Sequence, residues 1–464
     1  MMSIFDFFSK LFGRSETSEQ SVSSEMQSAL SVWLDLYQHG GGTNSDSRSL
    51  NLPAAICSEF TRLMMAESVI GTAGDSARSQ FLNVQLRRML DFFRIYRADA
   101  ALALGSMAFK PYVSGGRVLV DQVRADRYVP TAFDDAGEPT AAIFMARKFI
   151  GHRYYTRLET HTFHAESQTY TVENRAYCSL SRDSLGHPCS LNSVDDWAGL
   201  QEEQTISGVT RPLFSVFRVP AANTVDLDSA LGVSVFASAD ELIADANAQW
   251  ARILWEFKGT ELAVDASEML FRRDRTTREL LELPAGSKRL FRKYPTQDKS
   301  ISEIMQTFSP QIRDESLLRG LNRMLRQIEF NVGLAYGTLS DPTDTDKTAE
   351  EVRASKQRSY VQVSALQSSL QTALEGLLYA MDAYTSLYDL APSGRTELTC
   401  TWGDSVLEDT DKEYQRRMQM MTAGLLRGDL LVSWYFGCSA EDARLKYMPD
   451  TQPDLFGSGV PSLR

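Results

Sequence analysis

The stretch "GTLSDPTDTDKTAEEV", Gly337 to Val352, separates two long helical patterns and decides how the chain is organised. Its second half predicts a helix start, because Thr348 and Glu351 have the spacing of a capping box. A threonine at the N-cap position stabilises the helix behind it by ~1 kcal/mol. Pro342 prevents the preceding helix from running through, because proline lacks the backbone N–H that a helix interior needs. The sequence therefore predicts a short loop with a sharp boundary on each side.

The loop is acidic, and this charge bears on what it could bind. Between Gly337 and Val352, three aspartates and two glutamates stand against one lysine, a net charge of −4. Asp344, Asp346 and Glu350 invite comparison with a calcium loop, but the glycine required after the third ligand is missing. A phosphate cradle needs glycine-rich backbone amides, which "DKT" lacks, and the carboxylates would repel a phosphate. Both sites are disfavoured, and the sequence predicts neither a metal nor a cofactor.

Helical periodicity flanks the loop on both sides. Apolar residues recur at helical spacing from Asp314 to Gly333, although Gly320 weakens this helix by up to ~1 kcal/mol against alanine. A second pattern predicts a helix from Asp240, as its cap, to Gly259. Behind the loop, Ala349 to Leu390 predicts the longest helix, about 60 Å at 1.5 Å per residue. Its nearly regular a/d stripe is typical of core or helix-partner packing. The stripe consists of Val363, Leu366, Leu370, Leu374, Leu377, Met381, Tyr384 and Tyr388.

Three further patterns fill the rest of the chain. From about Ser24 to Met107 the pattern is helical. From about Lys110 to Pro220 it changes to segments rich in β-branched and aromatic residues, several of them alternating, with turns such as "SGGR" between them. This predicts an antiparallel sheet module attached to helices. Near the end, "TELTCTW" predicts a short strand, and the segment from Asp411 to Met448 predicts a final helical unit.

The overall charge argues against a protein that grips nucleic acid tightly. The chain has 464 residues, enough for two to four compact units, and a formal net charge of −12. Nucleic-acid binding usually needs a basic surface, because neutralisation of phosphates supplies most of the affinity. One segment, Phe271 to Lys299, has nine basic and four acidic residues. It is either a solvated surface or a docking surface for an acidic partner or nucleic acid. Its candidate docking residues are Arg272, Arg273, Arg275, Arg278, Lys288, Arg289, Arg292 and Lys293.

Catalytic motifs are not apparent in the sequence. His161 and His164 form an H-x-x-H pattern, but three residues along a strand place them on opposite faces, and we expect surface histidines. A Walker-type loop, a G-x-S-x-G elbow and H-E-x-x-H are all missing. The five scattered cysteines suit reduced thiols in a cytosolic environment, and no apolar run approaches the ~18 residues of a membrane span. We therefore expect no enzyme and no membrane protein, although the many carboxylates do not exclude a carboxylate site.

At the level of whole motifs, the chain resembles the portal proteins of tailed double-stranded-DNA bacteriophages. The closest type is the portal family of long, non-contractile-tailed phages of Gram-positive hosts. The resemblance rests on "GLAYGT", then "KTAEEV" opening a long helix, followed by "SYVQV". Further matching stretches are "LPAAICSEFTRLMMAE", "VRADRYVPTAFDDAGEPTAAIF", "YYTRLETHTF", "VENRAYCS", "RPLFSVFRVPAANTVDLDSALGVSVF", "WGDSVLEDTDKE" and "GLLRGDLLVSWYFGCSAEDA". They span nearly the whole chain in the order of the family.

The resemblance implies an α+β portal fold that forms a ring. Residues 1–238 would form the wing, with N-terminal helices and an antiparallel β module. Residues 239–260 and 313–335 would be the two stem helices, with the clip at 261–312 between them. The tunnel loop would cover 336–348, the long helix and a return strand of the wing 349–403, and the helical crown 404–464. The tunnel-loop residues expected to line the DNA channel are Thr338, Ser340, Asp341, Thr343, Asp344, Thr345, Asp346 and Lys347.

The same resemblance implies a function and partners. Twelve copies would surround a channel at one capsid vertex, through which the terminase packages genome DNA and from which the DNA is later ejected. The partners would be the terminase large subunit, a head-completion adaptor, the major capsid and scaffolding proteins, and double-stranded DNA that passes without sequence specificity. The protein would reside in the virion, and in the host cytoplasm during assembly. Two alternatives stay open: another oligomeric scaffold of a phage-like particle, and a metal-dependent nucleic-acid enzyme.

Overall fold

In a computed structural model, the protein is α+β, with 48% of its residues in helices and 24% in strands. The structure describes residues 23–41, 48–182, 184–227, 229, 231–261, 263–267, 291–294, 305–308, 311–342, 349–403, 410–436 and 438–447. The chain divides into two compact units, Met1–Trp402 and Gly403–Arg464. We describe each unit by itself.

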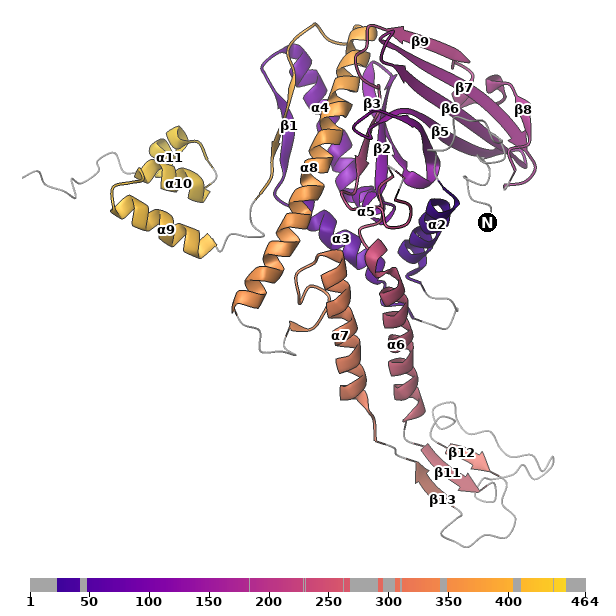
Figure 1. Cartoon of the computed structure of the whole chain (residues 1–464), viewed down its shortest axis with the longest axis vertical. Helices are drawn as coiled ribbons and strands as arrows, with labels where there is room; N and C mark the ends of the chain where they lie inside the picture. Colours follow the sequence, from indigo (N-terminus) through magenta and orange to yellow (C-terminus); the bar gives the residue numbers. More distant parts are fainter. Residues whose placement is uncertain are drawn as a thin grey trace, which may run out of the picture. The chain divides into compact units, whose positions relative to one another are not determined.

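Four helices open the described part of the first unit, as the periodicity predicts (Figure 1). They are α2 (Ser24–His39), α3 (Leu52–Met65), α4 (Ala77–Tyr96) and α5 (Ala98–Ala103). Serine side chains cap two of them: Ser23 accepts a hydrogen bond from the backbone amide of Met26, and Ser76 accepts one from Ser79. Each such cap satisfies a backbone donor that the first turn of a helix leaves without a partner.

Two antiparallel sheets follow these helices. The smaller one has the order β10-β2-β3 and the larger one β4-β5-β6-β7-β8, with β9 also paired to β7. The strands of the small sheet are β2 (Ser106–Ser114), β3 (Arg117–Arg124) and β10 (Ser215–Arg218). Those of the large sheet are β4 (Tyr128–Phe133), β5 (Pro139–Ile150), β6 (Arg153–His164), β7 (Thr169–Ser179), β8 (His187–Cys189) and β9 (Glu203–Ser207). The predicted antiparallel module is therefore confirmed.

The predicted helical region from Ser24 to Met107 is wrong in two places, where the chain forms strands. Residues Val69–Ala73 form strand β1 between α3 and α4, and β2 already begins at Ser106. Gly105 explains the second change, because its φ of 78° is a left-handed conformation that ends the helical run. At this point the backbone of Gly232 passes so close that a Cβ on Gly105 would lie 2.5 Å from the Gly232 carbonyl oxygen.

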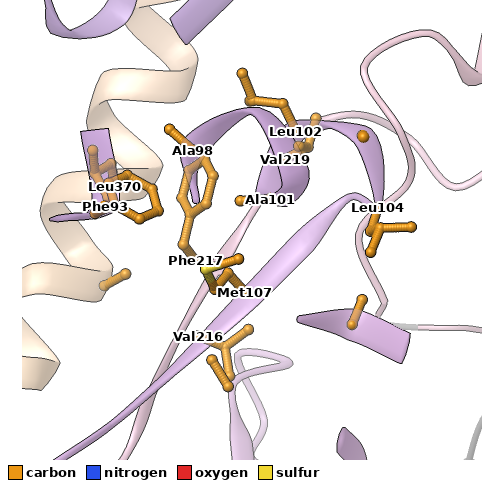
Figure 2. Packing of buried hydrophobic residues seen from close by; sticks show 14 of the residues in the cluster. Phe93, Ala98, Ala101, Leu102, Leu104, Met107, Val216, Phe217, Val219 and Leu370 are labelled. Atoms are coloured by element: carbon orange, nitrogen blue, oxygen red, sulfur yellow. The ribbon is translucent and has the colours of Figure 1, made fainter. Parts of the chain in front are cut away.

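The core of the first unit forms where helices and the small sheet meet. Figure 2 shows Phe93 of α4, Met107 of β2, Phe217 of β10 and Leu370 of the long helix among the buried side chains. Phe93 makes an edge-to-face contact with Phe217, with ring centroids 6.3 Å apart. Edge-to-face packing is a favourable arrangement of aromatic rings in a core. These contacts connect segments that lie more than a hundred residues apart in the sequence.

Two long helices leave the sheets and run antiparallel to each other (Figure 1). They are α6 (Asp240–Gly259) and α7 (Asp314–Val332). The side chain of Ser238 donates to the carbonyl of Asn331 at one end of the pair, and Arg313 donates two hydrogen bonds to Glu256 at the other. Both predicted helices are confirmed. The predicted cap is wrong by one position, because a 3-10 turn at Ala237–Ala239 leads straight into the helix and leaves Ala239 at the N-cap.

A small β unit lies between α6 and α7 in the sequence. Its strands are β11 (Ala263–Ser267), β12 (Phe291–Tyr294) and β13 (Met305–Phe308). The central strand β11 pairs in parallel with β12 and antiparallel with β13. The sequence analysis assigned no strands here. Segments this short, lying within a charged region, do not have a readable alternation of apolar and polar residues.

The longest helix, α8 (Ala349–Leu387), packs its apolar stripe into the core of the first unit. It begins at Ala349, directly after the predicted cap Thr348, which lies outside the described residues, so the capping box stays a prediction. The six members of the stripe from Val363 to Met381 are at most 2% exposed. After α8, strand β14 (Glu397–Thr401) pairs antiparallel with β1, so the chain returns to its N-terminal helices.

The second unit contains the predicted C-terminal helices, α9 (Thr410–Thr422), α10 (Gly428–Phe436) and α11 (Ala440–Tyr447). The buried carboxylate of Asp429 holds α10 and α11 together, because it accepts hydrogen bonds from Arg427 and from Arg444. The guanidinium of Arg417 lies 4.4 Å from the ring centroid of Trp434 and so connects α9 to α10. The unit is therefore held by ionic and cation–π contacts around a small core.

Candidate functional site: the root of the acidic loop

The turn that leads into the acidic loop begins at Gly333, nine residues before Pro342. α7 ends at Val332, and Gly333 takes the left-handed conformation with a φ of 84°. The amide of Leu334 donates to the carbonyl of Glu329, which is typical of a glycine C-cap. Gly333 therefore ends the helix, at the end of the predicted range and nine residues before Pro342.

One buried carboxylate organises the turn that follows. Glu329, in the last turns of α7, is 0% exposed. Its carboxylate accepts hydrogen bonds from the amides of Gly337, Leu339 and Ser340 and from the hydroxyl of Ser340, at distances of 2.6–3.3 Å. A buried carboxylate is costly unless several donors solvate it, and here the backbone supplies them. We call Glu329 together with Gly333–Asp341 the loop root.

Two more contacts complete the loop root. The amide of Asp341 donates to the side-chain oxygen of Asn322 on α7, at 2.8 Å. The hydroxyl of Thr338 donates to the carbonyl of Ala335, at 2.6 Å. The chain is thus tied back onto α7 as far as Asp341, and the segment that leaves this anchor starts at Pro342.

The other side of the loop is fixed through an arginine of α8. The guanidinium of Arg358 lies 4.6 Å from the ring centroid of Phe330 and 5.1 Å from that of Tyr336. Stacking on two aromatic faces suits a planar guanidinium and holds α8 against the end of α7. Residues 343–348 are therefore bracketed by two anchored segments.

The predicted tunnel-loop residues divide into three groups. Thr338 and Asp341 are exposed at the loop root. Ser340 is only 4% exposed, and its hydroxyl donates a hydrogen bond to Glu329. The expectation that Ser340 lines a channel wall is therefore corrected. Thr343, Asp344, Thr345, Asp346 and Lys347 lie outside the described residues. Glu329 was missed by the sequence analysis, because its partners are mainly backbone amides, which leave no pattern in a sequence.

The structure describes only two of the eight predicted docking residues. Arg292 and Lys293 lie on β12, where the backbone pairs them with Asp265 and Ala266 of β11. The remaining six candidates, Arg272, Arg273, Arg275, Arg278, Lys288 and Arg289, lie outside the described residues. The docking surface therefore stays a prediction from sequence.

A second buried polar cluster lies where β2, β6 and β7 meet. The carboxylate of Glu159 forms ion pairs with Lys110 and Arg157, and it accepts a hydrogen bond from Nε2 of His161 at 2.9 Å. Nδ1 of His161 lies 2.7 Å from the hydroxyl of Tyr170, which donates to it when the imidazole is neutral. Burial lowers the pKa of His161, and the cations beside Glu159 hold the pKa of that carboxyl well below its usual value despite burial. The expectation that His161 is a surface histidine is wrong, because it is 2% exposed.

This cluster has the perturbed pKa values of a catalytic site but a closed arrangement. Each polar group of its histidine is bonded to a protein partner, and the lysine side chain is 7% exposed. A reacting group would have to break these bonds before it could approach. The cluster is best explained as a polar contact that joins the two sheets.

Two surveys of the described residues bear on other kinds of site. Within the parts of the chain that the structure describes, no group of three or more His, Cys, Asp or Glu side chains is arranged to hold a metal ion. None of the described helices combines the length and the apolar character needed to cross a membrane. In comparisons with known proteins, the chain matches no family model and no curated protein.

Proposed function

We propose that this protein is the subunit of a portal ring, a channel through which a phage-like particle packages and releases double-stranded DNA. The observation that carries the proposal is the order α6, small β unit, α7, anchored acidic loop, α8. An antiparallel helix pair that holds a small β unit, followed by a loop fixed at both ends, agrees with the order of stem, clip, stem, tunnel loop and long helix that the sequence resemblance implies. The α+β composition is consistent with the same reading.

In this proposal, the parts of the chain take these roles. The helices and sheets before residue 239 form the wing, to which α8 and β14 return. α6 and α7 form the stem, residues 261–312 the clip, and α9–α11 the crown. The basic residues between Arg272 and Lys293 would face the terminase during packaging and an adaptor afterwards.

The loop root supports the proposed role of the acidic loop. Glu329 and Arg358 fix the two sides of residues 343–348, which carry Asp344 and Asp346. A channel must let DNA pass without holding it, and acidic side chains repel phosphates within a distance of about 8 Å at physiological salt. Twelve such loops would form an acidic collar around the DNA. The net charge of −12 per chain fits a conduit better than a DNA-binding surface.

The experiment is electron microscopy of the purified full-length protein, with mass measurement of the assembled species. We expect rings with an open axial channel, and twelve subunits in the particle-bound form. A closed or filamentous oligomer would favour another scaffold of a phage-like particle. A monomer that cleaves DNA with added Mg²⁺ or Mn²⁺ would overturn the proposal in favour of an enzyme.

A further inference from the structure

An apolar groove lies between helix α4 and strand β3. It has a volume of about 380 Å³, with residues of α4 on one side and residues of β2 and β3 on the other. On α4, it is lined by Phe92, Ile95 and Tyr96, which are 45%, 67% and 65% exposed. On β3, it is lined by the half-buried side chains of Leu119 and Val120. Apolar surface that faces water costs about 25 cal/mol for each Å², so a cover over this groove would stabilise the protein.

The groove also runs beside an open sheet edge. β3 is the outer strand in the order β10-β2-β3, and within the described residues no strand pairs with its outer side. Proteins commonly protect such an edge with charges, a proline, a bulge, or a covering helix or loop. The stretch Val118–Val120 has neither charge nor proline, and its pairing with β2 has no bulge. A covering segment would protect this stretch and fill the groove at the same time.

The first residues of the chain have the composition of such a segment. Residues 1–22 lie outside the described residues, and large apolar residues are concentrated between positions 4 and 12. They are Ile4, Phe5, Phe7, Phe8, Leu11 and Phe12. At 100° per residue, all of them except Phe7 fall within about 120° of a helix circumference, and Asp6 and Lys10 fall on the opposite side. The pattern predicts an amphipathic helix, which needs an apolar surface on which to bury one face.

We infer that residues 4–12 of the chain dock into this groove as a helix, with the apolar face toward α4 and β3 and the polar face toward water. When a helix binds in a groove, its apolar anchors recur at positions i, i+3, i+4 and i+7. Phe5, Phe8 and Phe12 have the i, i+3 and i+7 spacing. The contact forms within one copy of the chain and does not depend on the proposed ring.

The neighbours of α2 bring the groove within reach of this segment. α2 begins at Ser24 and contacts α5, which directly follows α4. It also contacts the 3-10 turn Ala125–Arg127, which directly follows β3. Both walls of the groove therefore end next to α2, which has 16 residues and is about 24 Å long. The connection from Phe12 to Ser23 can span up to about 36 Å, so it is longer than α2 and can lead the segment back to the groove.

Disulfide cross-linking of the full-length protein tests the contact. In Phe8→Cys/Ile95→Cys, we expect oxidation to join the segment to α4 within one chain. A denaturing gel should then show a faster band that reduction removes. The matched control is Lys10→Cys/Ile95→Cys, which should lose this band because Lys10 falls on the polar face. The five natural cysteines are present in both variants, so any cross-link of their own appears equally in the two.

Hydrogen–deuterium exchange gives an independent measurement that needs no introduced cysteine. We expect Phe5→Ser/Phe8→Ser to speed the exchange of the backbone amides at Val118–Val120, because the cover over the sheet edge is lost. Asp6→Ser on the polar face should leave this exchange unchanged. Equal cross-linking from positions 8 and 10, or equal exchange in the two serine variants, would overturn the inference. A cross-link that joins only separate chains would overturn docking within one copy.

Discussion

Glu159 and Glu329 are two carboxylates that are shielded from water in different ways. Glu159 lies between Lys110 of β2 and Arg157 and His161 of its own strand β6, so Lys110 and Arg157 balance its charge and His161 hydrogen-bonds to it. Glu329 is bonded to three backbone amides and one hydroxyl of the segment that follows its own helix. The first carboxylate joins elements that are distant in sequence, and the second holds the segment Gly333–Asp341 directly after its own helix. The difference predicts a global effect for one and a local effect for the other.

Removal of Glu159 is expected to lower the free energy of unfolding more than any other change considered. Glu159→Ala leaves Lys110 and Arg157 without their common partner in a nearly dry site, and breaking such a pair typically costs ~3–5 kcal/mol. Urea unfolding followed by circular dichroism measures the loss. Glu173→Ala is the matched control on the next strand, because the Glu173–Arg175 pair is well exposed and should contribute less than ~1 kcal/mol. Equal effects of the two substitutions would contradict the proposed role of the cluster.

Removal of Glu329 should act more locally. Glu329→Ala deprives the amides of Gly337, Leu339 and Ser340 of their acceptor, and we expect a cost of ~1–3 kcal/mol concentrated in the loop root. Glu329→Gln keeps one acceptor oxygen and should fall between the wild type and the alanine variant. Hydrogen–deuterium exchange of Leu339 and Ser340 measures the effect. Unchanged protection in Glu329→Ala would show that other contacts hold the turn.

Acidification should weaken the ionic cluster around Glu159 and His161. Burial lowers the pKa of His161, so the unfolded chain binds a proton near pH 6.5 that the folded protein does not take up until a lower pH. Stability is therefore fully present above about pH 6.5 and declines as the pH falls toward the lowered pKa. The lowered pKa of Glu159 adds a further loss below its ordinary value of 4.5. Urea unfolding at pH 7.5, 6.0 and 5.0 measures this decline. In His161→Gln, the part between pH 6.5 and 5 should disappear, and a persisting decline would assign it to other groups.

The same comparison explains what the sequence could and could not predict. α6, α7 and α8 were predictable, because their apolar residues recur at helical spacing over 19 residues or more. The closed cluster around His161 was not, because Lys110 of the small sheet meets Glu159 and Tyr170 of the large sheet only where the two sheets pack together. Glu329 was not predictable either, since a carboxylate held by backbone amides has no sequence signature. The small β unit escaped because its strands are four or five residues long.

A change in residues 343–347, just beyond the loop root, should have the smallest effect on stability. It is also the sharpest test of the loop. If the loop root holds its shape through Glu329, replacing Thr343–Lys347 by a Gly/Ser segment of equal length should change the unfolding free energy by no more than ~0.5 kcal/mol. The same replacement of Gly337–Asp341 should destabilise the protein measurably, because it removes the hydroxyl of Ser340 and the close fit around Glu329. In a particle that packages DNA, the first variant should nevertheless impair packaging or retention of the genome if the proposed collar forms, since it removes Asp344 and Asp346. Full-length packaging by that variant would reduce residues 343–347 to a linker between two anchored helices.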